Sequence, residues 1–339
     1  MLPWLKEGKF PLYLAPMAGF TDLAYRQLCK DEGADVLITE FAMSDSINRD
    51  IPEAWALTEF HESQRPMGIQ IFGATPESMA KAAHRIEERC RPDFIDLNFG
   101  CPSEKVTCQM AGASLLKTPR ELTRIAAEVV KEVKSIPVTA KIRTGWDEEN
   151  IVADQLVPML QDVGIQALTI HGRTKVQGYS GEPDWDLIKS IAASTSLPII
   201  GNGNIRNSAQ VHEIMTQSNV SGVMIGRAAL GYPWLFREIK THLETGHTPP
   251  PPTLQHRWKT ILDYAHQLAS RPENAHFEGK IMWMRSKIVK LTKAMHGSKN
   301  LRLELNQTET LDQLHEISKQ HLERYSHADV VIQERFRRR

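Results

Sequence analysis

The sequence predicts an α/β protein that consists of a (β/α)8 TIM barrel followed by a smaller all-helical domain. A chain of 339 residues is too long for one ordinary hydrophobic core, so a large domain with a smaller one is expected. Short apolar runs alternate with segments of helical periodicity through most of the chain. Four consecutive prolines, residues 249–252, then precede a region whose patterns are helical only.

The apolar runs number eight, which favours a closed barrel over an open doubly wound sheet. They are rich in Val, Ile and Leu without strict alternation, as is typical of parallel strands buried on both faces. The predicted strands are residues 12–15, 36–39, 67–72, 94–98, 138–142, 167–170, 198–201 and 222–225.

The segments between the runs indicate helices. Thr75 followed by Pro76 is a typical N-cap with proline at the first helical position. The stretch from Thr118 to Glu121 reads as a capping box, and apolar residues follow it at helical spacing. We therefore expect a barrel domain over residues 1–246, a proline-rich linker over 247–252 and a basic helical domain over 253–339.

Cysteine usage and hydropathy indicate the cellular setting. Cys29, Cys90, Cys101 and Cys108 form no CxxC pair and no metal-like spacing, so neither a disulfide framework nor a metal site is expected. The first ten residues lack the apolar core of a signal peptide, and no run of about 18 apolar residues is present. These features predict a cytoplasmic protein without a membrane span.

The net charge is zero, but the charge is distributed unevenly. Residues 240–339 hold 17 Lys and Arg against 11 Asp and Glu, whereas residues 1–239 hold 24 against 30. This asymmetry hints at an anionic partner for the last third of the chain. On charge alone, an ordinary solvated surface is the better interpretation.

Polar residues at the ends of the predicted strands are the candidates for chemistry, because barrel enzymes build their sites there. Glycines after the last two strands let backbone N–H groups approach a phosphate, and their place in the barrel favours a phosphate site over simple turn chemistry. The candidates in chain order are Pro16, Met17, Ala18, Gln70, Asn98, Cys101, Lys141, Arg143, His171, Arg173, Asn202, Gly203, Asn204, Gly226 and Arg227.

Lys141 and His171 lie in strand ends, where a charged or titratable side chain needs a partner. A flavin ring would supply one, because its edge becomes anionic on reduction and a lysine would stabilise it. The alternatives are an ion pair between Lys141 and Glu40, and a satisfied core position for His171. Gln70 must be hydrogen-bonded if it is buried, and by itself it is uninformative.

Cys101 stands out from the other cysteines, which we interpret as packing residues. It lies on a Gly-Cys-Pro turn directly after the fourth predicted strand. It could act as a nucleophile or as an acid there. An unperturbed thiol, with a pKa of about 8.5, is mostly protonated at neutral pH and can donate a proton.

Together these stretches resemble the tRNA-dihydrouridine synthase family, most closely its bacterial B subfamily. The resemblance extends from Leu12 to about Glu244 and rests most firmly on Asn98 to Pro102 and on His171 to Thr174. Phe99, where Met is common, and Thr107–Cys108, where an Asn is common, are small departures.

The resemblance implies an oxidoreductase that reduces the C5=C6 bond of a tRNA uridine with FMN and NADPH. Hydride would pass from N5 of FMN to C6, and Cys101 would donate a proton to C5. Pro16, Met17 and Ala18 would lie under the flavin, and Gln70, Lys141 and His171 would contact its ring. The flavin phosphate would be held by Asn202, Gly203, Asn204, Gly226 and Arg227. Asn98, Arg143 and Arg173 would face the target uracil.

Residues 279–303 are expected to contact the tRNA backbone as one basic helix. Their charged residues are all basic up to position 303: Lys280, Arg285, Lys287, Lys290, Lys293, Lys299 and Arg302. Ile281, Met284, Ile288, Leu291 and Met295 would form the apolar stripe of that helix. We expect Lys287 and Lys290 to contact the RNA. The terminal Arg335, Arg337, Arg338 and Arg339 would add to the positive electrostatic field.

Two other functions remain open at this point. An FMN barrel acting on a small pyrimidine, as dihydroorotate dehydrogenases do, would share the phosphate site but has no need of a basic helical domain. A tRNA-binding chaperone with a vestigial redox site would not need Cys101, Lys141 and His171 together. The resemblance also implies a monomer without an obligate protein partner.

Overall fold

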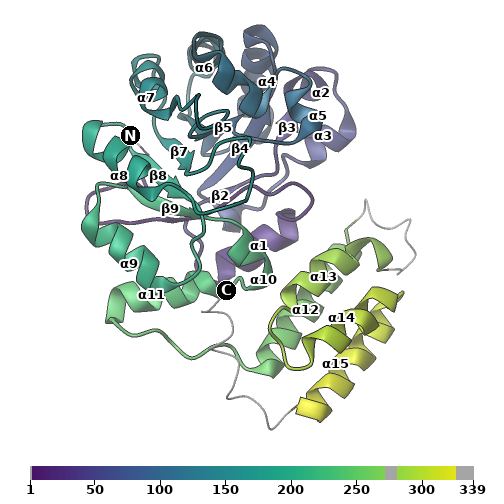
Figure 1. Cartoon of the computed structure of the whole chain (residues 1–339). Helices are drawn as coiled ribbons and strands as arrows, with labels where there is room; N and C mark the ends of the chain where they lie inside the picture. The colour runs from purple at the N-terminus through teal and green to yellow at the C-terminus, as the bar shows by residue number, and fades with distance from the viewer. Residues whose placement is uncertain (1, 272–280, 326–339) are drawn as a thin grey trace. The chain divides into compact units, whose positions relative to one another are not determined.

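A computed structural model describes residues 2–271 and 281–325 (Figure 1). The chain divides into two compact units. The first, called the barrel unit, comprises Met1–Arg26, Ala34–Ile205 and Gln210–Gly226. The second, called the helical unit, comprises Gln27–Gly33, Arg206–Ala209 and Arg227–Arg339.

The barrel unit contains one parallel sheet whose strands follow the order β1-β9-β8-β7-β6-β5-β4-β2. A parallel bridge between Tyr13 and Val36 brings β1 next to β2 and nearly closes the barrel. The predicted eight-stranded barrel is thus confirmed, and a short extra strand, β3, pairs with β4. The strands are β1 (Leu12–Leu14), β2 (Leu37–Ile38), β3 (Ala42–Met43), β4 (Met67–Phe72), β5 (Phe94–Phe99), β6 (Val138–Arg143), β7 (Leu168–His171), β8 (Ile199–Asn202) and β9 (Gly222–Ile225).

The interior of the barrel begins with an apolar layer and continues with a polar one. Phe94, Tyr13, Ile200 and Met224 are buried in one cluster, so these residues mark the inward face of their strands. Phe94 fills the space beside Gly68, where a Cβ would lie 2.3 Å from the Phe94 ring. Because side chains two apart share a face of a strand, the next inward residues are polar ones such as Asp96 and Asn202.

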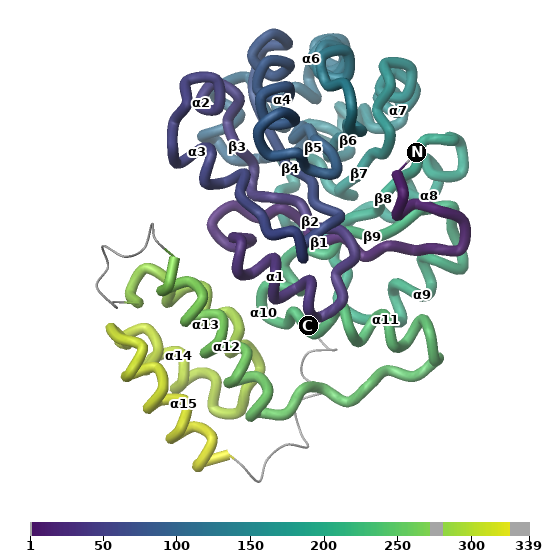
Figure 2. Tube along the Cα trace, turned by 180° about the vertical axis from the view of Figure 1, so that it is seen from behind, coloured from purple at the N-terminus to yellow at the C-terminus, as the bar shows by residue number. Residues whose placement is uncertain are grey.

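Helices follow the strands around the barrel (Figure 2). The N-cap predicted at Thr75 is present, because its side chain accepts a hydrogen bond from the Ser78 N–H. The helices are α1 (Leu23–Asp31), which runs into the helical unit, α2 (Ser44–Asn48), α3 (Pro52–Ala56), α4 (Pro76–Cys90), α5 (Glu104–Thr107), α6 (Pro119–Glu132), α7 (Ala153–Asp162), α8 (Trp185–Ser194) and α9 (Ser208–Gln217), with 3-10 turns η1 (Glu62–Gln64) and η2 (Gly112–Lys117).

The capping box predicted at Thr118 is not formed. Helix α6 does begin at Pro119, but the Thr118 side chain makes no cap hydrogen bond. Its hydroxyl instead donates to the Leu115 carbonyl at 3.4 Å. Glu121, the expected partner, pairs with Arg124 on the next turn of the helix. The preceding 3-10 turn therefore competes with the cap for the same hydroxyl.

The helical unit packs its helices around buried aromatic residues. Trp258 is buried and donates from Nε1 to His321 Nδ1 at 3.1 Å. Residues 247–252 contain no helix or strand, and α12 follows with Thr253 as its N-cap. The helices are α10 (Arg227–Gly231), α11 (Leu235–Thr245), α12 (Leu254–Ala269), α13 (Arg285–Leu291), α14 (Ser298–Gln307) and α15 (Leu311–Tyr325), with a 3-10 turn η4 (Met282–Met284).

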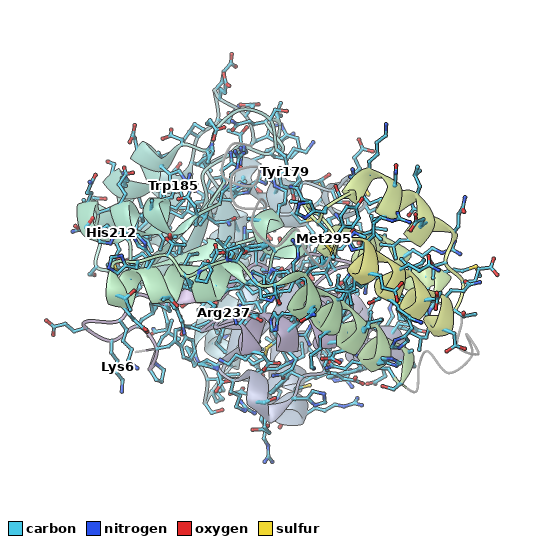
Figure 3. All side chains as sticks on the ribbon, turned by 90° about the horizontal axis from the view of Figure 1, so that it is seen from below. Lys6, Tyr179, Trp185, His212, Arg237 and Met295 are labelled. Atoms are coloured by element: carbon cyan, nitrogen blue, oxygen red, sulfur yellow. The ribbon has the colours of Figure 1, made fainter. Side chains whose placement is uncertain are left out.

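The single basic helix expected over residues 279–303 is wrong for the part that the structure describes. A 3-10 turn, the seven-residue α13 and the start of α14 replace it. Ala294 and Gly297 adopt positive φ values of 58° and 60°, which a continuous helix cannot include. The apolar stripe is still buried from Ile281 to Met295, which is labelled in Figure 3. Lys280 and the arginines from 335 onward lie outside the described residues.

In the described part of the chain, no helix combines the length and the apolar character that a membrane crossing requires.

Candidate active site

A chain of hydrogen-bonded side chains lies behind the Cys101 turn, inside the barrel. Asp96 Oδ2 accepts from Gln70 Nε2 at 2.6 Å, and Gln70 Oε1 accepts from Asn98 Nδ2 at 2.7 Å. Asn98 Oδ1 then accepts from the backbone N–H of Cys101 at 2.9 Å and of Gly100 at 3.1 Å. Three strand-end side chains are thereby linked to the backbone of the turn.

The hydrogen-bond partners at both ends of this network fix the orientation of the Asn98 and Gln70 side-chain amides. Backbone N–H groups can only donate, so Asn98 must present its oxygen to the turn. Its NH2 group then faces the Gln70 oxygen, and the Gln70 NH2 group faces Asp96. A carboxylate oxygen accepts that bond, and Thr139 donates to the other Asp96 oxygen at 2.6 Å. The register of β4, β5 and β6 brings these side chains together.

Cys101 is half-buried and lies in the turn that follows β5. Its carbonyl accepts from the Ala113 N–H at 3.1 Å, and its side chain packs against a small apolar cluster that includes Phe72 and Val106. Burial raises the pKa of the Cys101 thiol, while the Ser103 backbone, Arg143 and Lys141 act in the opposite direction. The net direction keeps the thiol protonated at neutral pH, as an acid requires.

Two buried arginines hold backbone carbonyls around the turn. Arg143 donates from Nε to the Gly100 carbonyl at 3.0 Å and from Nη1 to the Thr174 and Gly178 carbonyls at 2.9 Å each. Its guanidinium lies 5.6 Å from the ring centre of Tyr179, which is labelled in Figure 3. Arg143 therefore ties the residue before Cys101 to the loop after β7.

Arg173 has a similar arrangement two residues beyond β7. It is 1% exposed, and its Nε donates to the Ser180 carbonyl at 3.1 Å while Nη2 donates to the Gly181 carbonyl. Nη1 lies 3.5 Å from His171 Nε2. A guanidinium only donates, so a hydrogen bond across this long contact has His171 Nε2 as its acceptor.

Lys141 lies on β6 opposite Asn98 of β5 and is partly exposed. Within the described residues, its ammonium makes no hydrogen bond and no ion pair. The alternative of a pair with Glu40 is wrong, since Glu40 Oε2 accepts from the Gly19 N–H at 2.6 Å instead. Desolvation, with repulsion by Arg143, lowers the pKa of Lys141 to about 8. An ammonium in such a place favours an electronegative ligand.

The loop after β8 has a backbone conformation that restricts residue type. Gly203 has a φ of 147°, and a Cβ there would lie 2.6 Å from Pro183 Cβ. Asn204 follows with a φ of 47° and donates from its amide to Glu182 at 2.7 Å. Asn202 is buried and donates to the Met224 carbonyl at 2.7 Å. The turn conformation and the close packing of Pro183 therefore account for glycine at position 203, and the Gly203 carbonyl accepts from Trp185 Nε1 at 3.0 Å.

The loops after β1 and β9 meet at the same end of the barrel. A Cβ at Gly226 would lie 3.6 Å from Ala15 Cβ and 3.7 Å from Met17 Sδ. Pro16 and Met17 are half-buried, and Ala18 is exposed. Arg227 is the next residue after Gly226 and opens α10 of the helical unit, which also contains the half-buried Lys287 and Lys290.

Asp96, for which the sequence predicted no role, lies in the centre of the site. It is 1% exposed, and burial raises the pKa of its carboxyl group. The available signal was its position two residues before Asn98, which puts both side chains on one face of a strand. The backbone carbonyls that hold Arg143 and Arg173 carry no signal in the sequence, because they depend on loop conformation.

Two solved structures that share the fold have low sequence identity to this chain. A histamine dehydrogenase from Rhizobium sp. 4-9 has a TM-score of 0.53 at 14% identity over 76% of this chain. A 2-naphthoyl-CoA reductase has a TM-score of 0.52 at 12% identity over 69%. The chain spans about half the length of each, 48% and 50%. These likenesses bear on the fold alone.

Curated relatives are much more similar in sequence. The tRNA-dihydrouridine synthase B of Pasteurella multocida is 37% identical over 263 residues, which are 76% of this chain and 77% of the relative. The enzyme of the same name from Escherichia coli K12 is 39% identical over 71% and 74%. A probable tRNA-dihydrouridine synthase of Aquifex aeolicus is 35% identical over 91% and 94%. The family model described as dihydrouridine synthase matches residues 13–327. The chain therefore belongs to the dihydrouridine synthase family of oxidoreductases, with B-type enzymes among its relatives.

Proposed function

We propose that this protein is a tRNA-dihydrouridine synthase that reduces the C5=C6 bond of a uridine in tRNA, with FMN as cofactor and NADPH as reductant. The observation that carries the proposal is the half-buried Cys101 thiol on a braced turn, with the unpartnered Lys141 ammonium on the neighbouring strand. The reduction requires a proton donor and a cation, and the Lys141 ammonium makes no hydrogen bond or ion pair with the described residues.

The residues around the barrel mouth fit a flavin on physical grounds. Lys141 would contact the electronegative edge of the flavin ring, which would give its ammonium a hydrogen-bond partner. His171 and Gln70 lie on the strands to either side of β5 and β6, and Pro16, Met17 and Ala18 follow β1. The backbone of Asn202, Gly203 and Asn204, with Gly226 and the adjoining Arg227, would hold the phosphate. When bound, the flavin supplies hydride chemistry for C6 of the uracil.

Cys101 would donate the proton that C5 of the uracil receives. The direction of its pKa shift favours a neutral thiol, which is the form that can donate. The second N–H of the Asn98 amide has no partner among the described residues and is available to a uracil carbonyl. Arg143 and Arg173 contact backbone carbonyls on several sides, so we propose that they chiefly position the turn and the loop that face the base.

The substrate is proposed to be tRNA, with the basic residues Lys287 and Lys290 contacting phosphates. A uridine in a loop costs least to extract from its stack, so a base can reach the barrel mouth there. We also propose that the enzyme is cytoplasmic and that it acts as a monomer. The proposed domains remain a barrel over residues 1–246, a linker over 247–252 and a helical domain over 253–339.

The decisive experiment is Cys101→Ala with the flavin and the product measured separately. We expect the variant to retain its flavin and to oxidise NADPH, while dihydrouridine formation in tRNA falls by about 10²- to 10⁴-fold. Cys108→Ala is the matched control, because Cys108 is an exposed thiol in the same loop. It should retain full activity.

Two outcomes would contradict the proposal. Loss of flavin in Cys101→Ala would indicate a structural role for the thiol. Reduction of a free pyrimidine in preference to tRNA would favour the small-pyrimidine alternative, which shares the flavin site and lacks the RNA substrate.

A further inference from the structure

A cavity of about 740 Å³ lies in the barrel unit beside the first turn of α6, and the proposed reaction does not use it. Residues 116–120 form one wall, and Trp146, Asp147 and Asn150 form another. Trp146 follows three residues after Arg143, at the end of β6. The segment between Cys101 and Lys117 folds back on itself, because the Ala113 N–H donates to the Cys101 carbonyl. The cavity is therefore at the same end of the barrel as Cys101, and its volume is typical of ligand sites.

Positive charge is concentrated on this cavity. The ammonium groups of Lys117 and Lys175 lie 3.6 Å and 4.5 Å from the ring centre of Trp146. Neither lysine makes an ion pair with any residue that the structure describes, and the same holds for Arg120 at the cavity wall. Two ammonium groups on one ring repel each other, so the arrangement favours an anion between or beside them.

The acidic residues nearby do not neutralise this charge. Asp147 accepts from the backbone N–H of Asn150 at 2.9 Å and from its side-chain amide at 2.6 Å, so its carboxylate braces the turn. Glu148 and Glu149 of the same loop do not line the cavity. Glu121 in the first turn of α6 pairs with Arg124. Lys117 and Arg120 therefore line the cavity with one carboxylate, which is already hydrogen-bonded, and Lys175 lies beside the lining on Trp146.

The N-terminus of α6 adds one further backbone donor to the same place. The Thr118 hydroxyl donates to the Leu115 carbonyl and does not cap the helix, as described above. Residue 119 is proline, and the N–H groups of Glu121 and Leu122 donate to the Thr118 carbonyl at 3.0 Å and 3.1 Å. Of the first four residues of α6, Arg120 therefore has the one backbone N–H without a partner among the described residues. A phosphate is the anion that suits lysines, an arginine and a helix N-terminus together.

We propose that the cavity beside Lys117 and Trp146 binds a backbone phosphate of the substrate RNA, at a nucleotide outside the one that is reduced. The proposal rests on the proposed function, because it takes the RNA as substrate. Lys117 and Arg120 are exposed, which suits a long polyanion that passes over the rim of the barrel. The indole ring holds the two ammonium groups beside the cavity through cation–π contacts. A nicotinamide dinucleotide also carries phosphates, and the experiment separates it from RNA.

The test uses the flavin-bound full-length protein and the double variant Lys117→Gln/Lys175→Gln. Binding of bulk tRNA is titrated at several salt concentrations, and the KM for NADPH is measured without RNA. We expect tRNA affinity at low salt to fall about tenfold and the slope of log K against log [salt] to fall by about 1 to 2. The KM for NADPH should stay unchanged.

The control Lys81→Gln/Lys131→Gln removes the same charge from exposed lysines of α4 and α6 that do not line the cavity. It should change neither the tRNA affinity nor the salt slope by a comparable amount.

The outcomes separate the two proposals. If the double variant binds tRNA with the affinity and salt slope of the wild type, the cavity is not an RNA site. If the KM for NADPH rises and tRNA binding is unchanged, the cavity belongs to the reductant and the RNA proposal is overturned. If the wild type itself neither binds nor reduces tRNA, the proposed function fails first. Trp146→Phe keeps an aromatic ring under the two ammonium groups and should bind tRNA more tightly than Trp146→Leu, whereas equal affinity of the two would show that the ring does not position the lysines.

Discussion

Asp96 has the position of a residue that acts through others. Its carboxyl group contacts neither Asn98 nor Cys101 directly, yet it determines which end of the Gln70 amide points toward Asn98. Removing it leaves a buried NH2 group without an acceptor, at a cost of about 1–3 kcal/mol. The Gln70 amide can then rotate and release Asn98 from the turn. Asp96 is therefore expected to be a positioning residue for the thiol.

We predict that Asp96→Ala lowers dihydrouridine formation by at least about tenfold, because the Cys101 turn loses its brace. Asp96→Asn should retain much more activity, since an amide oxygen can still accept from Gln70. The rate at which iodoacetamide alkylates Cys101, measured by peptide mass spectrometry against Cys108, reports the turn itself. A merely destabilising role would leave that relative rate unchanged in the folded protein.

The lowered pKa of Lys141 predicts a pH dependence of flavin binding. With a pKa of about 8 in the free protein, the ammonium loses its charge as the pH rises through that value. An electronegative ligand edge favours the charged form, so the pKa in the complex is higher than in the free protein. Between these two pKa values the complex holds more protons, and affinity must fall as the pH rises.

The measurement is the Kd of FMN for the deflavinated protein from pH 7 to pH 9, by quenching of flavin fluorescence. The Kd should rise above about pH 8 in the wild type and stay flat in Lys141→Met. Riboflavin should show the same slope, because it has the ring without the phosphate. A slope that persists in Lys141→Met would assign it to another group.

At the scale of elements, α4 and α6 begin with the same Thr-Pro pair and end up capped differently. Thr75 accepts from the Ser78 N–H, whereas Thr118 donates to the turn before its helix. We predict that Thr75→Ala destabilises the protein by about 1 kcal/mol and that Thr118→Ala has little effect. Urea unfolding of the two variants, followed by circular dichroism, gives the comparison. Equal losses would mean that the Thr118 hydroxyl contributes through its bond to Leu115.

These two helices show what the sequence can and cannot reveal about an element. The start of each helix was predictable, because proline is confined to the first turn. The cap at Thr118 was not, because the competing 3-10 turn of residues 112–117 has no periodic signal. The end of the helix after α13 was not predictable either. Gly297 is a recognisable helix breaker, but nothing in the sequence indicates the positive φ of Ala294.

For the whole molecule, the barrel was predictable because buried parallel strands leave continuous apolar runs. All eight strands begin and end within one residue of the predicted runs, whereas the two-residue β3 lies outside those runs. The site was predictable as a set of strand ends, since every barrel gathers its strand ends at one face. The bonds within it were not, because the contact between Gln70 and Asp96 depends on the register of two strands distant in sequence.

The charge asymmetry of the chain leads to a prediction about how it binds RNA. Lys287 and Lys290 lie on α13, a segment in which every charged residue is basic. If they contact phosphates, each removed contact reduces counterion release, and the slope of log K against log [salt] falls by about 1. Lys287→Glu/Lys290→Glu should therefore weaken tRNA binding strongly at low salt and less at high salt, while NADPH oxidation in the absence of RNA stays unchanged. Lys259→Glu/Lys319→Glu changes the charge of the same unit equally on α12 and α15 and is the matched control. Equal losses in both variants would show that only the net charge of the helical unit attracts the RNA, and that α13 forms no specific contact.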